Sequence, residues 1–439
     1  MSEALATAIA VRKRHVAAAV AGNALEFYDF TTYAFYAAQI GRAFFPSGSP
    51  LVSLMLSLAT FGAGFVTRPL GALVIGRYAD RVGRRPAMLL SFTLMGLSLL
   101  ILGLCPSYAA IGPAASVIVV VARLVQGFAL GGEVGPTTSF LLEAAPPHRR
   151  GLYTAFQSIS QNAAALVAGL IGLLLASLLD TAQMDSFGWR IALLLGTIVL
   201  PFGILVRRTL PETAHAHDTI HHHPDAHRHL TGGQLRVILC SMAILCGGTV
   251  ATYIQSYLTT YTSVILGMKV NIAFGATVTY GLTGIASNLI GALVSERHGR
   301  RLVMIAPRII LMLAIIPGFW MLVANRNAET LIAMTAFMTL CASTSGGAMM
   351  AAIAESLKKS NRASTFSIVY ALPIVVFGGA TQFVVTWLIH VTGDIMAPAY
   401  FYVFATIVSL IGMFALRESA PAHASVRRRH QPFSTLSPS

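Results

Sequence analysis

Long apolar stretches follow one another along the whole chain and constrain its fold more than any other feature. Each is about 20 residues long, which is the length that an α-helix needs to cross the hydrocarbon core of a bilayer. Only 10% of the 439 residues are charged, against about 25% in soluble domains. This is too little charge to cover the surfaces of soluble domains, so a soluble enzyme, a secreted protein and a disordered chain are excluded.

The apolar stretches predict an all-α membrane protein with twelve transmembrane helices. The first stretch is too long for the core of a cleavable signal peptide and contains Glu26 and Asp29. Strand-type alternation is missing, which argues against a membrane β-barrel. The predicted spans lie near residues 16–38, 52–75, 87–105, 114–137, 152–178, 189–206, 235–258, 272–295, 302–323, 331–352, 365–388 and 398–416.

The positive charges follow the loops between these spans. Of the 30 Lys and Arg residues, only Arg42, Lys269 and Arg326 fall in the loops of one side, and Arg190 lies at the same side's end of the sixth span. Cytoplasmic loops are enriched in Lys and Arg, so we expect both termini in the cytoplasm of a bacterium and the spans in its inner membrane. The net charge of +14 then reflects topology, and we expect no nucleic-acid partner.

The chain contains one internal repeat. The segment Asp80–Arg85 follows the second span, and the similar segment Glu296–Arg301 follows the eighth, 216 residues later. Such a repeat predicts two parallel six-helix halves with a substrate site between them, which is a transporter architecture. The predicted organisation is a first half at residues 1–206, a cytoplasmic linker at 207–233, a second half at 234–418 and a basic cytoplasmic tail at 419–439.

The linker is rich in histidine, with seven residues between His215 and His229. This composition is typical of a metal- or pH-responsive segment, but we favour a solvated tether whose composition drifts freely. The four cysteines lack the spacing of metal ligands, so we expect neither a metal site nor a cofactor. The basic tail is expected to contact anionic lipid headgroups. We expect the Gly346–Gly347 and Gly378–Gly379 pairs to permit close helix packing or bending.

Several motifs resemble those of a known family. Gly76–Arg85 looks like the signature loop between helices two and three of the major facilitator superfamily, and Arg123–Gly127 resembles its proton-coupled motif. Gly22–Phe30 and Tyr153–Gln161 are similar to the metabolite:proton symporter family within it. Phe377–Ala380 is most similar to the segment in citrate- and tricarballylate-proton symporters. The resemblance implies the twelve-helix major facilitator fold, proton coupling and alternating access, and no enzymatic activity.

The function that we expect is secondary active import of a small carboxylate by proton symport. Citrate or a related tricarboxylate is the first choice, and a monocarboxylate, a dicarboxylate, a shikimate-like acid or a zwitterionic osmolyte is the alternative. A proton-antiporting drug efflux pump is less favoured, because the first and fifth spans carry polar faces. A sensor would need a soluble signalling domain, and ATP-driven transport would need a Walker motif. We expect a monomer whose partners are the carboxylate, protons and membrane lipid.

Polar residues inside the spans are the candidate ligands. A charge in a span costs about 2.5–3.5 kcal/mol and therefore faces a cavity or a partner. The planar guanidinium of Arg123 suits a carboxylate, because it can donate two parallel hydrogen bonds. The alternative for Arg123 is a structural ion pair with Glu26, Asp29 or Glu133, and the alternative for the glutamines is hydrogen bonding between helices. The expected substrate-binding residues are Asn23, Tyr33, Arg123, Gln126, Gln157, Gln161 and Tyr257.

Two further roles are assigned to charged residues. Proton coupling is expected at Glu26 or Asp29, with Glu133 as a further candidate. Arg68, near the cytoplasmic end of the second span, is expected to act in gating or structure rather than in substrate contact. The gating residues, which would hold one access state closed as the resemblance implies, are Asp80, Arg81, Gly83, Arg84, Arg85, Glu143, Arg150, Glu355 and Arg362.

Overall fold

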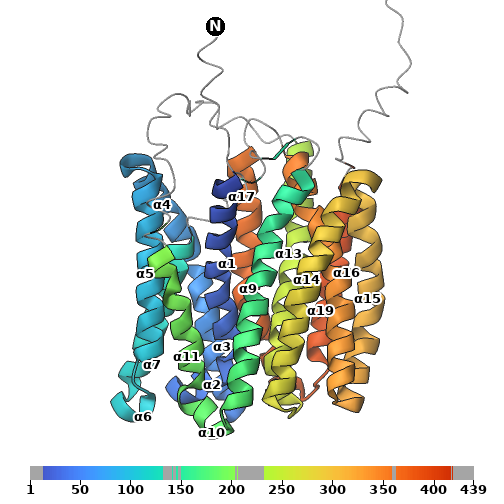
Figure 1. The fold of residues 1–439 in the computed structure, drawn as a ribbon. Coiled ribbons are helices and arrows are strands. Elements are labelled where there is room, and N and C mark those ends of the chain that lie inside the picture. The colour runs from blue at the N-terminus through green and yellow to red at the C-terminus, as the bar shows by residue number, and fades with distance from the viewer. Residues whose placement is uncertain are drawn as a thin grey trace, which may run out of the picture.

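The structure, a computed structural model, is a bundle of long helices that run alongside one another (Figure 1). It describes residues 13–131, 141, 145–146, 150–202, 205, 232–357, 362–416 and 418. No β-strand occurs among these residues. The predicted all-α fold is therefore confirmed.

Two groups of helices make up the bundle. The first half contains α1 (Lys13–Phe35), α2 (Ala37–Phe44), α3 (Pro50–Val66), α4 (Arg68–Val82), α5 (Arg84–Leu104), α6 (Tyr108–Ile111), α7 (Pro113–Leu130), α9 (Arg150–Leu178), α10 (Thr181–Gln183), the π-helical turn Met184–Gly188, α11 (Trp189–Leu195) and the 3₁₀ turn Gly196–Ile198. The second half contains α13 (Gly232–Thr260), the π-helical turn Tyr261–Ile265, α14 (Val270–His298), α15 (Arg300–Asn325), α16 (Ala328–Ser356), α17 (Arg362–Pro373), the π-helical turn Ile374–Gly378, α18 (Gly379–Thr392) and α19 (Ala397–Ala415).

Eleven helical segments of the described chain are long and apolar enough to cross a membrane. Helix α1 is not among them, because Asn23, Glu26 and Asp29 lower its hydropathy. It nevertheless lies inside the bundle beside α9 (Figure 1), and all three polar residues are buried. Together with α1 the segments make twelve spans, as the sequence predicts. An even number of crossings returns the chain to the side on which it started.

Glycine forms the tight turn in both copies of the repeated motif. Gly83 separates α4 from α5 with φ 113°, and Gly299 separates α14 from α15 with φ 95°. Residues with a Cβ atom avoid this backbone region, whereas glycine enters it freely. The two copies therefore have the same local conformation, and both turns lie at the same end of the bundle (Figure 1).

The two halves meet along two seams. Helix α9 packs against α14, and α3 packs against α18. A Cβ atom added to Gly281 of α14 would lie 2.6 Å from Leu166 Cα of α9, and one added to Gly379 would lie 2.7 Å from Gly62 Cα of α3. The backbones therefore approach too closely for any larger residue. The prediction that Gly379 permits close helix packing is confirmed.

One apolar cluster joins the two halves at the end of the bundle that holds α2. Leu54 and Leu58 of α3 pack there with Tyr257, Val385 and Ile389 of the second half. All five are at most 6% exposed. This cluster closes the space between the halves on the side opposite to the Gly83 and Gly299 turns.

Candidate functional site

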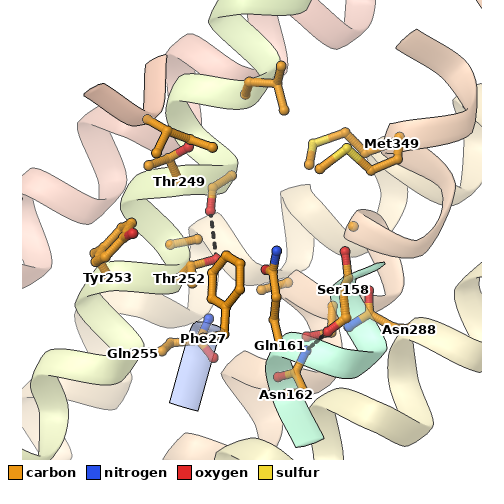
Figure 2. Close-up of a pocket in the computed structure, with 18 of the residues that line it drawn as sticks. Phe27, Ser158, Gln161, Asn162, Thr249, Thr252, Tyr253, Gln255, Asn288 and Met349 are labelled. Atoms are coloured by element: carbon orange, nitrogen blue, oxygen red, sulfur yellow. Dashed lines mark hydrogen bonds between the residues drawn. The ribbon is translucent and has the colours of Figure 1, made fainter. Parts of the chain in front are cut away.

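A cavity lies between the two halves of the bundle. Side chains from α1, α4 and α9 of the first half and from α13 to α17 of the second half line it. Figure 2 shows Phe27 and Gln161 at its centre, with Tyr253 on one wall and Asn288 on the other. The polar lining residues are Arg68, Ser158, Gln161, Asn162, Thr249, Thr252, Tyr253, Gln255, Tyr280, Asn288, Arg308, Ser343 and Tyr370.

Two arginines line this cavity, one from each half. Arg68 opens α4, and its Cζ atom lies 4.1 Å from the centre of the Phe65 ring and 4.5 Å from that of Phe30. Arg308 lies on α15, eight residues after its start, and is 1% exposed. No ion pair between two described residues involves either arginine. Each can therefore accept an anion from the cavity.

A second polar cluster lies behind the cavity wall, formed by Asp29, Arg123 and Gln126. All three side chains are fully buried, and none of them lines the cavity. Arg123 Nη1 lies 3.8 Å from Asp29 Oδ2. Arg123 donates a hydrogen bond to Gln126, and Gln126 donates one to Asp29. The structure thus brings together an acid, an arginine and an amide on α1 and α7 in a water-excluded site.

An aromatic wall separates this cluster from the cavity. Phe30, Phe61, Phe65 and Tyr253 contact one another, with ring centres 5.1–6.1 Å apart. The Phe30 ring lies 4.9 Å from Arg123 Cζ and also contacts Arg68, as described above. A single aromatic ring therefore holds one guanidinium on the cavity side and another within the buried cluster.

Among the expected ligands, Gln161 lines the cavity. Asn23 is instead engaged by α9, because its amide donates to Ser160 Oγ at 2.6 Å and to the Gln157 carbonyl oxygen at 3.3 Å. The Gln157 amide in turn donates to the Tyr370 hydroxyl at 3.4 Å. These contacts join helices, which is the alternative role that the sequence left open for the glutamines.

The remaining expected ligands also lie outside the cavity lining in this conformation. The Tyr33 hydroxyl donates to the Ser57 carbonyl oxygen at 3.3 Å. The Tyr257 hydroxyl accepts a hydrogen bond from Thr386 at 2.8 Å. Arg123 has Asp29 as its ion-pair partner, one of the structural pairs considered for it. Substrate contact by these residues and by Gln126 stays a prediction.

The acids expected to couple protons differ in what the structure shows of them. Asp29 belongs to the buried cluster described above. Glu26 is also buried, at 3% exposed, on the same helix. Glu133 lies outside the described residues. Among the described acids, Asp29 is the one that pairs with Arg123.

For most of the expected gating residues the structure does not describe the side chain. Arg81 is exposed at the end of α4, and the Gly83 turn was described above. Glu355 pairs with Arg300 of the second motif copy, at 3.3 Å. Glu143, together with the side chains of Asp80, Arg84, Arg85, Arg150 and Arg362, lies outside what the structure describes.

The second motif copy contacts both halves at its end of the bundle. The Glu296 carboxylate accepts a hydrogen bond from the backbone N–H of Leu152, at the start of α9, at 3.2 Å. The Glu418 carboxylate accepts hydrogen bonds from the backbone N–H groups of Arg300 and Arg301, both at 2.9 Å. A carboxylate is stabilised at a helix N-terminus, where the N–H groups lack partners in the helix. Glu418 thereby links α15 to the end of α19.

Sequence reasoning assigned no role to Arg308 and favoured gating for Arg68. The signal that could have found Arg308 was present, since a charge inside an apolar span is costly. The sequence could not show which arginine has a partner, because that depends on the packing of distant helices. Gln255 and Asn288 of the second half also line the cavity, and they were not assigned to the site from the sequence.

Comparison with known proteins identifies the class. A sequence profile described as Major Facilitator Superfamily matches residues 19–279 and 270–438. The chain therefore belongs to the major facilitator superfamily. The fold agrees, since the crystal structure of a D-xylose-proton symporter superposes with a TM-score of 0.76 at 16% identity, covering 92% of this chain and 98% of that one.

The curated relatives narrow the class further. The chain is 34% identical over 428 residues to the citrate-proton symporter of Klebsiella pneumoniae, covering 96% of each chain. It is 30% identical over 376 residues to the alpha-ketoglutarate permease of Escherichia coli (strain K12), covering 84% of this chain and 85% of that one. The chain is a multi-pass protein of the bacterial inner membrane.

Proposed function

We propose that this chain is a secondary active transporter that imports a small carboxylate together with protons by alternating access. The observation that carries the proposal is the pairing of two sites in one bundle. A cavity between the halves presents two arginines that pair with no described carboxylate, and a buried acid–arginine cluster lies directly behind the wall. One site suits an anion and the other suits a proton.

Substrate recognition begins with the cavity arginines. A guanidinium offers a planar set of N–H donors that matches the two oxygens of a carboxylate. The guanidinium of Arg68 lies against the rings of Phe30 and Phe65, which keep its orientation fixed. Gln161 adds an amide to the same cavity lining. Citrate or a related tricarboxylate remains the first choice, in line with the relatives. A monocarboxylate, a dicarboxylate, a shikimate-like acid and a zwitterionic osmolyte are the alternatives.

Proton coupling follows from electrostatics. Moving one negative charge against a potential that is negative inside costs about 2.3 kcal/mol per 100 mV, so accumulation of a polycarboxylate requires accompanying protons. Asp29 pairs with Arg123 in the structure. A substrate carboxylate near the wall competes for the arginine charge and leaves the Asp29 carboxyl free to take a proton. Proton and substrate binding then support each other.

The same proposal fixes the remaining assignments. The two halves at residues 1–206 and 234–418 move against each other, both termini face the cytoplasm, and the linker at 207–233 is a tether. The protein acts as a monomer in contact with membrane lipid and catalyses no chemical reaction. The polar cavity lining disfavours export of apolar drugs.

Uptake into proteoliposomes with an imposed pH gradient tests the proposal. Labelled citrate, tricarballylate, ketoglutarate, shikimate and proline should be compared at equal concentration. A carboxylate should accumulate only when the gradient drives protons inward, and a proton ionophore should abolish accumulation. Uptake of none of the acids, or uptake that does not depend on the gradient, would contradict proton symport of a carboxylate.

A further inference from the structure

Arg308 occupies a core position on an otherwise apolar helix face. Met304, Arg308, Leu311 and Ile315 follow one another three or four residues apart on α15, so they share one face. Each of them is at most 1% exposed. Ser345 of α16 donates a hydrogen bond to the Met304 carbonyl oxygen at 2.8 Å, which fixes this turn of α15 against α16. A charged side chain is thus held where the pattern otherwise places a hydrocarbon.

The buried guanidinium of Arg308 is not satisfied by its surroundings. Its Nε and Nη1 atoms have no hydrogen-bond partner in the described part of the chain, and it lines the cavity together with Asn288 and Ser343. A cation in a bilayer span is retained only where it faces a cavity or a counter-charge. No described carboxylate pairs with it, so an anionic ligand in the cavity can supply its counter-charge.

The amide donors of two neighbouring lining residues are already used by the protein. The Gln255 amide donates to the Tyr402 hydroxyl at 3.0 Å and accepts from Thr339 at 2.6 Å. The Asn288 amide donates to the Gly284 carbonyl oxygen at 2.9 Å. These side chains are therefore fixed by α14, α16 and α19. Among the described residues, Arg308 is the charged lining residue of the second half, and its Nε and Nη1 donors remain free.

We propose that Arg308 forms a second carboxylate subsite, so that a transported substrate carries at least two carboxylates. One carboxylate binds Arg68 of the first half and the other binds Arg308 of the second half. This inference rests on the proposed function and adds to it the ligand of the second half and the minimum number of charges. An acid with a single carboxylate satisfies one arginine and leaves the other buried and unpaired.

The two subsites also explain why a ligand would favour closure of the cavity. A ligand shifts a conformational equilibrium only through a difference in its affinity for the two states. An acid that spans Arg68 and Arg308 makes both contacts only when the halves are close. A monocarboxylate makes the same single contact in either state and so provides no such difference.

A matched series of acids on one propane skeleton tests this requirement. Tricarballylate, glutarate and butyrate carry three, two and one carboxylates, and their binding to the purified full-length protein can be measured by calorimetry. The affinity should fall about thirtyfold between glutarate and butyrate, which corresponds to about 2 kcal/mol. Equal affinities for these two acids would overturn the inference while leaving carboxylate transport intact.

Variants test whether Arg308 causes this step in affinity between glutarate and butyrate. Arg308→Met should weaken glutarate binding about thirtyfold but change butyrate binding by less than about threefold, so the step disappears. Arg308→Lys keeps the charge and should retain part of the step. Lys269→Gln removes an exposed cation at the start of α14 and should leave the whole series unchanged.

The outcomes separate this inference from the proposed function. A step of the same size in wild type, Arg308→Met and Arg308→Lys would assign Arg308 a structural role and overturn the second subsite. Should Arg308→Met fail to fold, Arg308→Lys and the wild-type series decide the question. If none of these acids nor citrate binds the wild-type protein, the proposed function fails, and this inference fails with it.

Discussion

Breaking the buried pair of Asp29 and Arg123 should have unequal effects from its two sides. Asp29→Asn leaves a buried guanidinium that stays charged, because arginine does not lose its proton in proteins. Arg123→Gln leaves a carboxyl group, which can be neutralised by taking up a proton. We therefore expect Asp29→Asn to lower the free energy of unfolding more than Arg123→Gln does.

The surroundings of the pair set the size of each effect. Removing one partner of a buried ion pair costs about 3–5 kcal/mol. In Asp29→Asn the guanidinium keeps Gln126 and the rings of Phe30 and Tyr33, whose centres lie 4.9 and 4.2 Å from its Cζ atom. Cation–π contact offsets part of the loss, so we expect about 3 kcal/mol. Arg123→Gln should cost about 1–2 kcal/mol, the penalty of unsatisfied buried polar groups.

The double variant completes the measurement. With both charges removed, the cluster of Asp29, Arg123 and Gln126 holds no charge, and the cost should be close to that of Arg123→Gln alone. The interaction energy from the double-mutant cycle is then about 3 kcal/mol. Equilibrium unfolding of the purified protein in detergent micelles by denaturant gives the four free energies.

An exposed pair in the same chain provides the control. Arg42 and Asp185 form an ion pair at the end of the bundle that holds α2, with side chains 46% and 36% exposed. Exposed pairs contribute about 0.2–1 kcal/mol, so the matching cycle with Arg42→Gln and Asp185→Asn should give no more than that. Equal interaction energies for the two pairs would refute the view that Asp29 and Arg123 form a desolvated ion pair.

Three further outcomes are expected. In transport, Asp29→Asn should abolish uphill uptake on a pH gradient yet spare substrate exchange at equilibrium; accumulation at the wild-type level would move the coupling acid elsewhere. Gly127→Ala should sharply reduce the yield of folded protein, because the new Cβ atom would lie 1.6 Å from the Gly64 carbonyl oxygen. As the control, Gly232→Ala should express normally, because its Cβ atom would meet no atom within 4 Å. Phe30→Ala opens the aromatic wall and should let protons leak without substrate, which a pH-sensitive dye inside liposomes would detect. A Phe30→Ala variant that does not leak protons would show that the ring does not seal the buried cluster.

Much of the fold could be predicted because the decisive features are local. An apolar stretch of about 20 residues specifies a span wherever the rest of the chain lies. A glycine between two spans specifies the tight turns at Gly83 and Gly299, since both turns need a backbone conformation that other residues avoid. The one span that hydropathy undervalues is α1, and its polar residues are buried against other helices rather than exposed to lipid.

The candidate site could be predicted only in part. The sequence correctly offered an ion pair with Asp29 as one role of Arg123, because both residues are charges inside spans that need partners. It could not show that Asn23 bonds to Ser160 on α9 or that Gln157 reaches Tyr370 on α17. Such pairs join residues more than 100 positions apart, and nothing local to either residue specifies the partner.

By itself, the sequence determined that this chain is a twelve-helix membrane protein built from a repeated unit, since span length, charge and turn chemistry are properties of short segments. Only the tertiary structure decided the separate roles of its three intramembrane arginines. In the sequence Arg68, Arg123 and Arg308 are each a lone cation within an apolar stretch, and nothing near any of them in the sequence shows its partner. Packing gives Arg123 a carboxylate on a neighbouring helix and leaves the other two facing the cavity, because the partner of a buried charge is set by which helix faces meet.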